Sequence, residues 1–135
     1  YAQGIYSQAW TEFLAGITDG ARQHVDLAMK FSPLDPLYDA MLSLRVLTHI
    51  AAGDDQVGAE WAERGARAPG AHALIAMIAA AAQALAGNGE QARRWAAEVR
   101  SRNPALTRND FFGAFPMKSE SMRMRFTAAL ESLGF

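Results

Sequence analysis

Cysteine is absent from this sequence of 135 residues. Without thiols the chain can form no disulfide, no thiolate nucleophile and no sulfur-ligated zinc site, and a reducing compartment is permitted. We therefore expect a cytoplasmic protein. The chain also begins without a basic and then apolar leader, so no secretory signal is predicted. Because it starts at Tyr1, we expect it to be the C-terminal part of a longer protein.

Charge of one sign and long hydrophobic runs are lacking as well. The formal net charge is −1 and the pI is near 6.3, so there is no overall attraction to nucleic acid or to anionic lipid. The most apolar stretch, residues 71–86, contains His72 and Gln83 and is shorter than the roughly 20 residues that cross a bilayer. We predict a buried helix there, and neither membrane nor nucleic-acid contact.

Motifs for catalysis and metal binding are missing too. The histidines His24, His49 and His72 lie 25 and 23 residues apart, so none forms the i, i+4 pair that binds one metal ion. No nucleophile elbow, Walker A motif or dinucleotide fingerprint is present. The adjacent Asp54 and Asp55 are interpreted as a helix cap and a charge that favours a helix N-terminus. We predict no catalytic residue, metal or cofactor, and expect this chain not to be an enzyme.

What is present is the pattern of helices. Half of the residues are apolar, alanine is the commonest residue, and Gly, Pro and Asp recur every 15 to 20 residues, as helix ends do. The sequence therefore predicts an all-α chain. The predicted helices cover residues 2–16, 19–31, 36–52, 55–68, 71–86, 89–102, 107–114 and 119–133.

Local signals predict several helix ends. Gly53 and Gly87 lie where helices would stop, because glycine reaches positive φ without a Cβ clash. Asn88, with Gln91 three residues later, resembles a capping box. The final helix places apolar residues on one stripe, which suits a terminal cap on the preceding hairpin.

A 34-residue repeat organises these helices. Trp61 and Trp95 are one such period apart, and other residues repeat in the same register: Gly53 with Gly87, Glu60-Trp61-Ala62 with Arg94-Trp95-Ala96, and Gly70 with Pro104. A weaker copy precedes these with an offset of 37. The period predicts one domain of hairpins at residues 2–33, 36–69 and 71–104, with a capping unit at 105–135. The shared position of the tryptophans indicates that they pack between repeats.

The period, the small residues Ala80 and Ala92, and the helix-ending prolines Pro33 and Pro104 resemble the tetratricopeptide (TPR) repeat. That resemblance implies a right-handed superhelical stack of antiparallel hairpins, in which small residues allow close helix approach. It also implies a non-enzymatic scaffold that binds other proteins.

A closer likeness involves residues 31–37 (FSPLDPL), 59–64 (AEWAER), 103–107 (NPALT) and the pair Phe115-Pro116. These resemble the C-terminal TPR regions of bacterial multidomain signalling proteins. The likeness implies a regulatory or assembly region. The alternatives are the regulatory C-terminal part of a class III adenylate or guanylate cyclase, or of an OmpR-type winged-helix transcriptional regulator.

In TPR arrays the first helix of each hairpin lines a concave groove. The residues that the resemblance places there are apolar, and we predict that they bind a protein or peptide partner: Tyr6, Trp10, Phe13, Leu47, Ile50 and Met77. Such a surface needs a cover in water. Three occupants remain open: a partner's amphipathic helix, a second copy of the chain in a homodimer, or upstream repeats with the chain's own C-terminal segment.

Basic residues gather late in the chain, at Arg93, Arg94, Arg100, Arg102 and Arg108. Because Glu90, Glu98 and Asp110 are interleaved with them, we interpret this run as a solvated helix face and not as a phosphate-binding patch.

Overall fold

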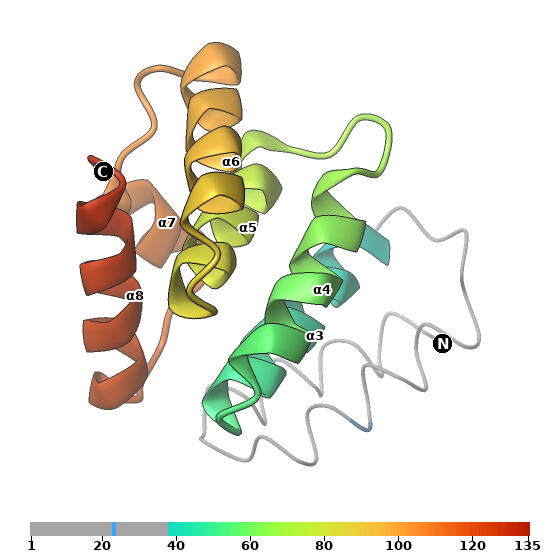
Figure 1. The fold of residues 1–135 in the computed structure, drawn as a ribbon, viewed down its shortest axis with the longest axis vertical. Coiled ribbons are helices and arrows are strands. Elements are labelled where there is room, and N and C mark those ends of the chain that lie inside the picture. Colours follow the sequence, from blue (N-terminus) through green and yellow to red (C-terminus); the bar gives the residue numbers. More distant parts are fainter. Residues whose placement is uncertain (1–22, 24–37) are drawn as a thin grey trace.

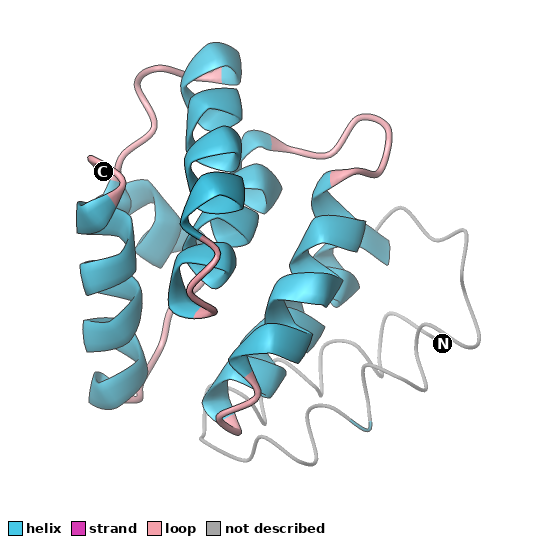
Figure 2. Ribbon diagram, viewed as in Figure 1, coloured by secondary structure: helices cyan, strands magenta, loops and turns pink. Residues whose placement is uncertain are grey.

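The computed structural model describes residue 23 and residues 38–135, with side chains for residue 23 and from residue 41 onward. From residue 38 on, these residues form helices and connecting turns and no strand (Figures 1 and 2). The chain is thus all-α where it is described, as predicted, with helix limits within two residues of the predicted ones. The predicted helices 2–16 and 19–31 lie outside this part. The helices are α3 (Tyr38–Ala51), α4 (Asp55–Ala66), α5 (Ala73–Leu85), α6 (Gly89–Arg102), α7 (Arg108–Ala114) and α8 (Glu120–Ser132).

Helices α3 and α4 form one antiparallel hairpin, and α5 and α6 form the next. The two hairpin turns have the same backbone hydrogen bond: Asp54 N–H donates to the His49 carbonyl at 2.9 Å, and Asn88 N–H donates to the Gln83 carbonyl at 2.8 Å. Asp54 and Asn88 also share their backbone conformation, with φ/ψ of −92°/62° and −93°/69°. The 34-residue repeat of the sequence is therefore a repeat of backbone structure at these turns.

Glycine makes both turns possible. Gly53 has φ of +89° and Gly87 has φ of +83°, a region that L side chains rarely adopt. Each lies two residues after the last residue of the first helix of its hairpin, so the prediction that these glycines end helices is confirmed.

Helix α5 lies at the centre of the described part (Figure 1) and packs against α3, α4, α6, α7 and α8. Every residue from Ile75 to Gln83 is buried, so this helix is covered on all sides and not only along one stripe. Its alanines allow the neighbouring helices to approach closely. The prediction of a buried helix at 71–86 is confirmed.

Small residues also form the contact face of α4. Its buried positions are Gly58, Ala59, Ala62, Gly65 and Ala66, which recur at the i, i+4 and i+7 spacing of one helix face. The contact with α3 is tightest at Gly58, where an added Cβ would lie 2.8 Å from Ile50 Cγ1 and 3.3 Å from the Val46 carbonyl oxygen. A glycine is therefore required for this helix spacing.

The last two helices form an aromatic cluster against α5. The rings of Phe111 in α7 and Phe126 in α8 are stacked with their centroids 5.6 Å apart, and both side chains are fully buried. Met122 and Leu130 belong to the same core cluster. The apolar stripe predicted for the final helix is thus the buried face of α8.

Two predicted caps differ from the structure. Asn88 makes no side-chain capping bond, because its amide Nδ2 instead donates to Gln83 Oε1 at 2.7 Å, so the capping-box prediction is wrong. Asp54 likewise makes no side-chain cap bond. A capping box exists elsewhere: Asp110 N–H donates to Thr107 Oγ1, and Thr107 N–H donates to the Asp110 carboxylate.

Candidate partner-binding surfaces

The predicted groove residues divide into two groups. Tyr6, Trp10 and Phe13 lie outside the described residues. Leu47, Ile50 and Met77 are 0%, 1% and 0% exposed and belong to one hydrophobic core cluster. Ile50 faces α4, the second helix of its own hairpin, since its Cγ1 lies against Gly58. A partner could reach these three side chains only if their cover moved, and their role in binding remains a prediction.

Helix α8 supplies part of the packing around the first helices. The contact between α8 and α5 is more extensive than the contact between α7 and α5. The buried side chains of α8 belong to the same core cluster as Leu47 and Met77. Arg125 joins α8 to the first hairpin: its Nη2 lies 2.5 Å from Asp55 Oδ2, and its Nη1 donates to the Ile50 carbonyl at 3.5 Å. Asp55 therefore forms an ion pair that joins two distant segments, the start of α4 and α8.

Two arginines of the basic run also contact α8 and the residues that follow it. Arg108 pairs with Glu131 at 2.6 Å. Arg100 donates to the Leu133 carbonyl, and its guanidinium lies 4.6 Å from the centroid of the Phe135 ring. These arginines have defined intramolecular partners, which the interpretation as a solvated face did not foresee.

A polar network connects the two hairpins at Glu63. The Glu63 carboxylate accepts from Trp95 Nε1, from Gln83 Nε2 at 3.1 Å and from Arg67 Nε at 3.0 Å. Gln83 is 4% exposed and also receives the bond from Asn88. Because donors from α5, α6 and the residue that follows α4 converge on one carboxylate, the orientation of the Trp95 indole relative to α4 is restrained.

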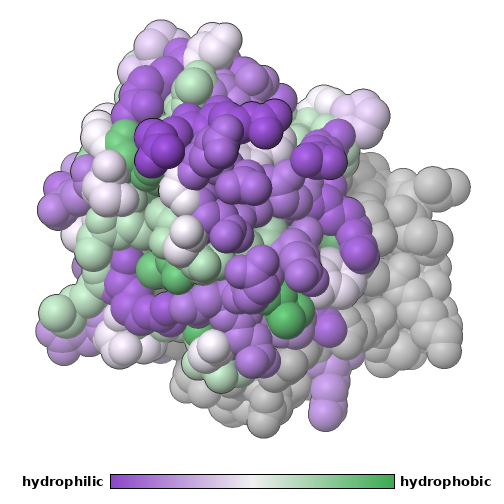
Figure 3. Space-filling view, in the orientation of Figure 1, coloured by the Kyte–Doolittle hydropathy of each residue, from purple (hydrophilic) through white to green (hydrophobic). Residues whose placement is uncertain are grey.

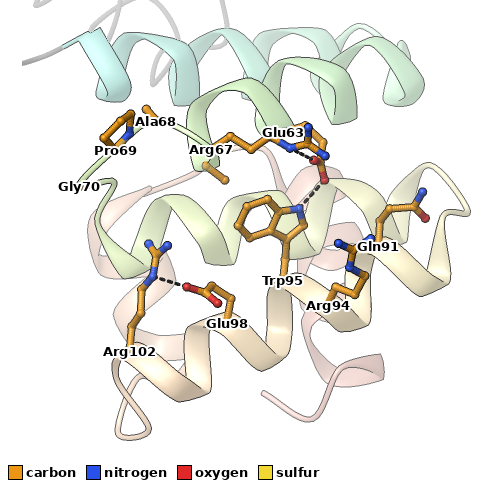
Figure 4. A pocket seen from close by; sticks show the side chains of 11 residues that line it. Glu63, Arg67, Ala68, Pro69, Gly70, Gln91, Arg94, Trp95, Glu98 and Arg102 are labelled. Carbon is orange, nitrogen blue, oxygen red and sulfur yellow. Dashed lines mark hydrogen bonds and ion pairs between the residues drawn. The ribbon is translucent and has the colours of Figure 1, made fainter.

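Beside this network lies a pocket of about 530 Å³, which we call the Trp95 pocket. In Figure 4 the indole projects from α6 toward Glu63, with Glu98, Arg102 and the loop at residues 68–70 on one side and Gln91 and Arg94 on the other. It is lined by residues of the second helices, α4 and α6, and of the loop that follows α4. Its lining is Glu63, residues 66–70, Gln91, Arg94, Trp95, Glu98 and Arg102.

Charges in the Trp95 pocket are mostly paired. Glu63 binds Arg67 as described, and Glu98 binds Arg102 at 2.7 Å. Arg102 also donates to the Ala71 carbonyl at 2.7 Å, which connects α6 to the loop before α5. No hydrogen bond or ion pair joins Arg94 to another residue in the described part of the chain.

Trp61, the repeat partner of Trp95, has different neighbours. Its ring stacks on His49 with centroids 6.3 Å apart, and the guanidinium carbons of Arg45 and Arg64 lie 4.9 and 4.6 Å from its centroid. Both tryptophans are partly buried against the core cluster. Trp61 and Trp95 therefore share a packing position in the repeat but differ in their polar contacts.

The accessible face of α4 and α6 is mainly hydrophilic, with small separate apolar patches (Figure 3). Within the described residues, no three His, Asp or Glu side chains are grouped so as to hold a metal ion, and no helix there is long and apolar enough to cross a membrane. Comparison with family models, curated proteins and solved structures finds no match for the chain.

Sequence reasoning missed the Trp95 pocket. It placed Trp95 among the packing residues, and Arg94 and Arg102 on a solvated face. The available signal was the 34-residue register, which puts the second helices side by side. That register could not show that the 67–70 loop would leave a hollow beside the indole.

Proposed function

We propose that this chain is a non-enzymatic protein–protein interaction module, a right-handed superhelical stack of TPR-type hairpins within the regulatory or assembly region of a larger bacterial protein. The observation that carries the proposal is the repeated hairpin turn, in which Asp54 and Asn88 have matching dihedral angles and matching hydrogen bonds. Stacked hairpins of this kind build extended surfaces, and such surfaces are used to bind other proteins.

The second helices provide the surface that a partner meets in the described part of the chain. Leu47, Ile50 and Met77 are buried, whereas the Trp95 pocket is open between α4 and α6. A partly buried tryptophan beside arginine is also typical of residues that dominate binding energy at interfaces. We therefore place the partner contact of this part on the α4–α6 side.

Peptide selection tests the proposal. A random peptide library displayed on phage would be panned against the whole chain, and the recovered peptides would be measured by fluorescence anisotropy. We expect a convergent set of peptides that bind the folded chain with micromolar dissociation constants.

The matched control is Leu44→Asp, which places a charge at a fully buried core position and should unfold the chain. Peptides that recognise the fold will not bind this variant. Recovery of no convergent set, or equal binding to the unfolded variant, would refute a peptide-binding module.

A further inference from the structure

We infer that the Trp95 pocket binds an acidic, extended segment of a partner protein, with an apolar side chain against the Trp95 indole and a carboxylate paired with Arg94. The inference rests on the proposed function and adds the site and the chemistry of the partner. It concerns the α4–α6 surface, which is separate from the groove predicted on the first helices.

The size of the pocket suits a few side chains of an extended peptide. Its volume of about 530 Å³ lies within the range of small-ligand sites. Trp95 is held by its Nε1 bond to Glu63, so the indole is already oriented before a ligand arrives. A rigid aromatic surface costs little conformational entropy on binding.

The unused hydrogen-bonding groups of the pocket are mainly donors. Its ionisable lining comprises three arginines and two glutamates, and both glutamates are paired with arginines. Arg94 makes no such pair among the described residues. Arg67 contacts Glu63 through Nε, while its side chain is 74% exposed. A guanidinium has five N–H donors and no acceptor, so the pocket is suited to an incoming acceptor.

A carboxylate matches this arrangement best. It accepts two parallel hydrogen bonds from a guanidinium, and these charge-assisted bonds are about twice as strong as neutral ones. Binding at Arg94 would not require breaking the Glu63–Arg67 or the Glu98–Arg102 pair. An acidic side chain therefore gains a contact without displacing an existing one.

The same charges disfavour a nucleic acid. A nucleic-acid strand brings a series of phosphates and gains affinity from several cations along its path. Here Glu63 and Glu98 flank the arginines, and the net charge of the chain is −1. Isolated carboxylates on a peptide fit this alternation of charges, whereas a phosphate backbone would meet the two glutamates.

The experiment compares two neighbouring arginines. Peptides selected on the folded chain would be measured against wild type, Arg94→Glu and Arg93→Glu by fluorescence anisotropy. Both variants change the net charge equally, but Arg93 does not line the pocket. We expect the selected peptides to carry Asp or Glu next to an apolar residue. Arg94→Glu should weaken their binding at least about tenfold, and Arg93→Glu less than about twofold.

Several results would overturn the inference. The inference is wrong if the selected peptides lack acidic residues, or if Arg94→Glu and Arg93→Glu weaken peptide binding equally or not at all. These results would leave the proposed function standing. The inference is also wrong if a single-stranded oligonucleotide binds more tightly than the selected peptides and displaces them. Circular dichroism checks that the variants are folded, and Arg94→Gln repeats the test without charge reversal. Failure to select any peptide would instead count against the proposed function.

Discussion

At the scale of single residues, backbone geometry separates glycines that are required from glycines that are replaceable. Gly87 has φ of +83°, and no heavy atom lies within 4 Å of an added Cβ. Substitution there consequently acts through backbone strain alone. Gly113, in α7, likewise has open space around an added Cβ, but its backbone is helical.

We expect Gly87→Ala to lower the free energy of unfolding by about 1–2 kcal/mol, the cost of a left-handed conformation for an L residue. Gly113→Ala should raise it by about 0.5–1 kcal/mol, since alanine loses less entropy in a helix. Urea unfolding followed by circular dichroism measures both. A stabilised Gly87→Ala variant would show that this turn is not held at positive φ.

At the scale of helices, close approach explains why α4 has glycine at two buried positions. At Gly58 an added Cβ meets Ile50 Cγ1 at 2.8 Å, which is a clash. At Gly65 the nearest atom, Leu42 Cβ, is 3.5 Å away, which is an ordinary contact. The two positions share one helix face but differ in the distance to α3.

Alanine substitution should therefore have opposite effects at these positions. Gly58→Ala should lower the free energy of unfolding by about 1–3 kcal/mol through overpacking, which exceeds the gain in helix propensity of about 0.5–1 kcal/mol. Gly65→Ala has the same gain in helix propensity without overpacking, so it should raise the free energy of unfolding. Thermal unfolding of both variants tests this, and an equally tolerated Gly58→Ala would contradict the close α3–α4 contact.

At the scale of the whole molecule, α8 connects the C-terminal unit to both hairpins. Its buried residues pack in the same cluster as those of α3 and α5, and Arg125 reaches Asp55 at the start of α4. This arrangement predicts that the C-terminal unit unfolds together with the hairpins and not as a separate step.

Phe126→Ala tests that coupling. Because Phe126 is fully buried, the change should cost about 3–5 kcal/mol. Unfolding curves from tryptophan fluorescence, which reports on the hairpins, and from circular dichroism should shift together. Met124 is 66% exposed on the same helix, so Met124→Ala is the control and should have little effect. An unshifted fluorescence curve in Phe126→Ala would show that α8 unfolds independently.

The sequence by itself determined the helices and the hairpin turns of the described part. These depend on local chemistry: Gly53 and Gly87 reach positive φ, the alanine-rich stretch at 71–86 has no strong polar face, and the 34-residue register puts equivalent residues at equivalent turns. Local signals did not determine every cap, because Asn88 could bond either to its own helix or to Gln83. The neighbouring helix supplied the better partner.

Only the tertiary structure decided the long-range polar contacts and the open surface. Arg125 and Asp55 are 70 residues apart, and Trp95 and Glu63 are 32 apart, so their pairing depends on how the hairpins and the last helix stack. The stack also decided that Leu47, Ile50 and Met77 are buried while Trp95 lines a pocket. Periodicity assigns a residue to a helix face, but exposure depends on which element finally packs against that face.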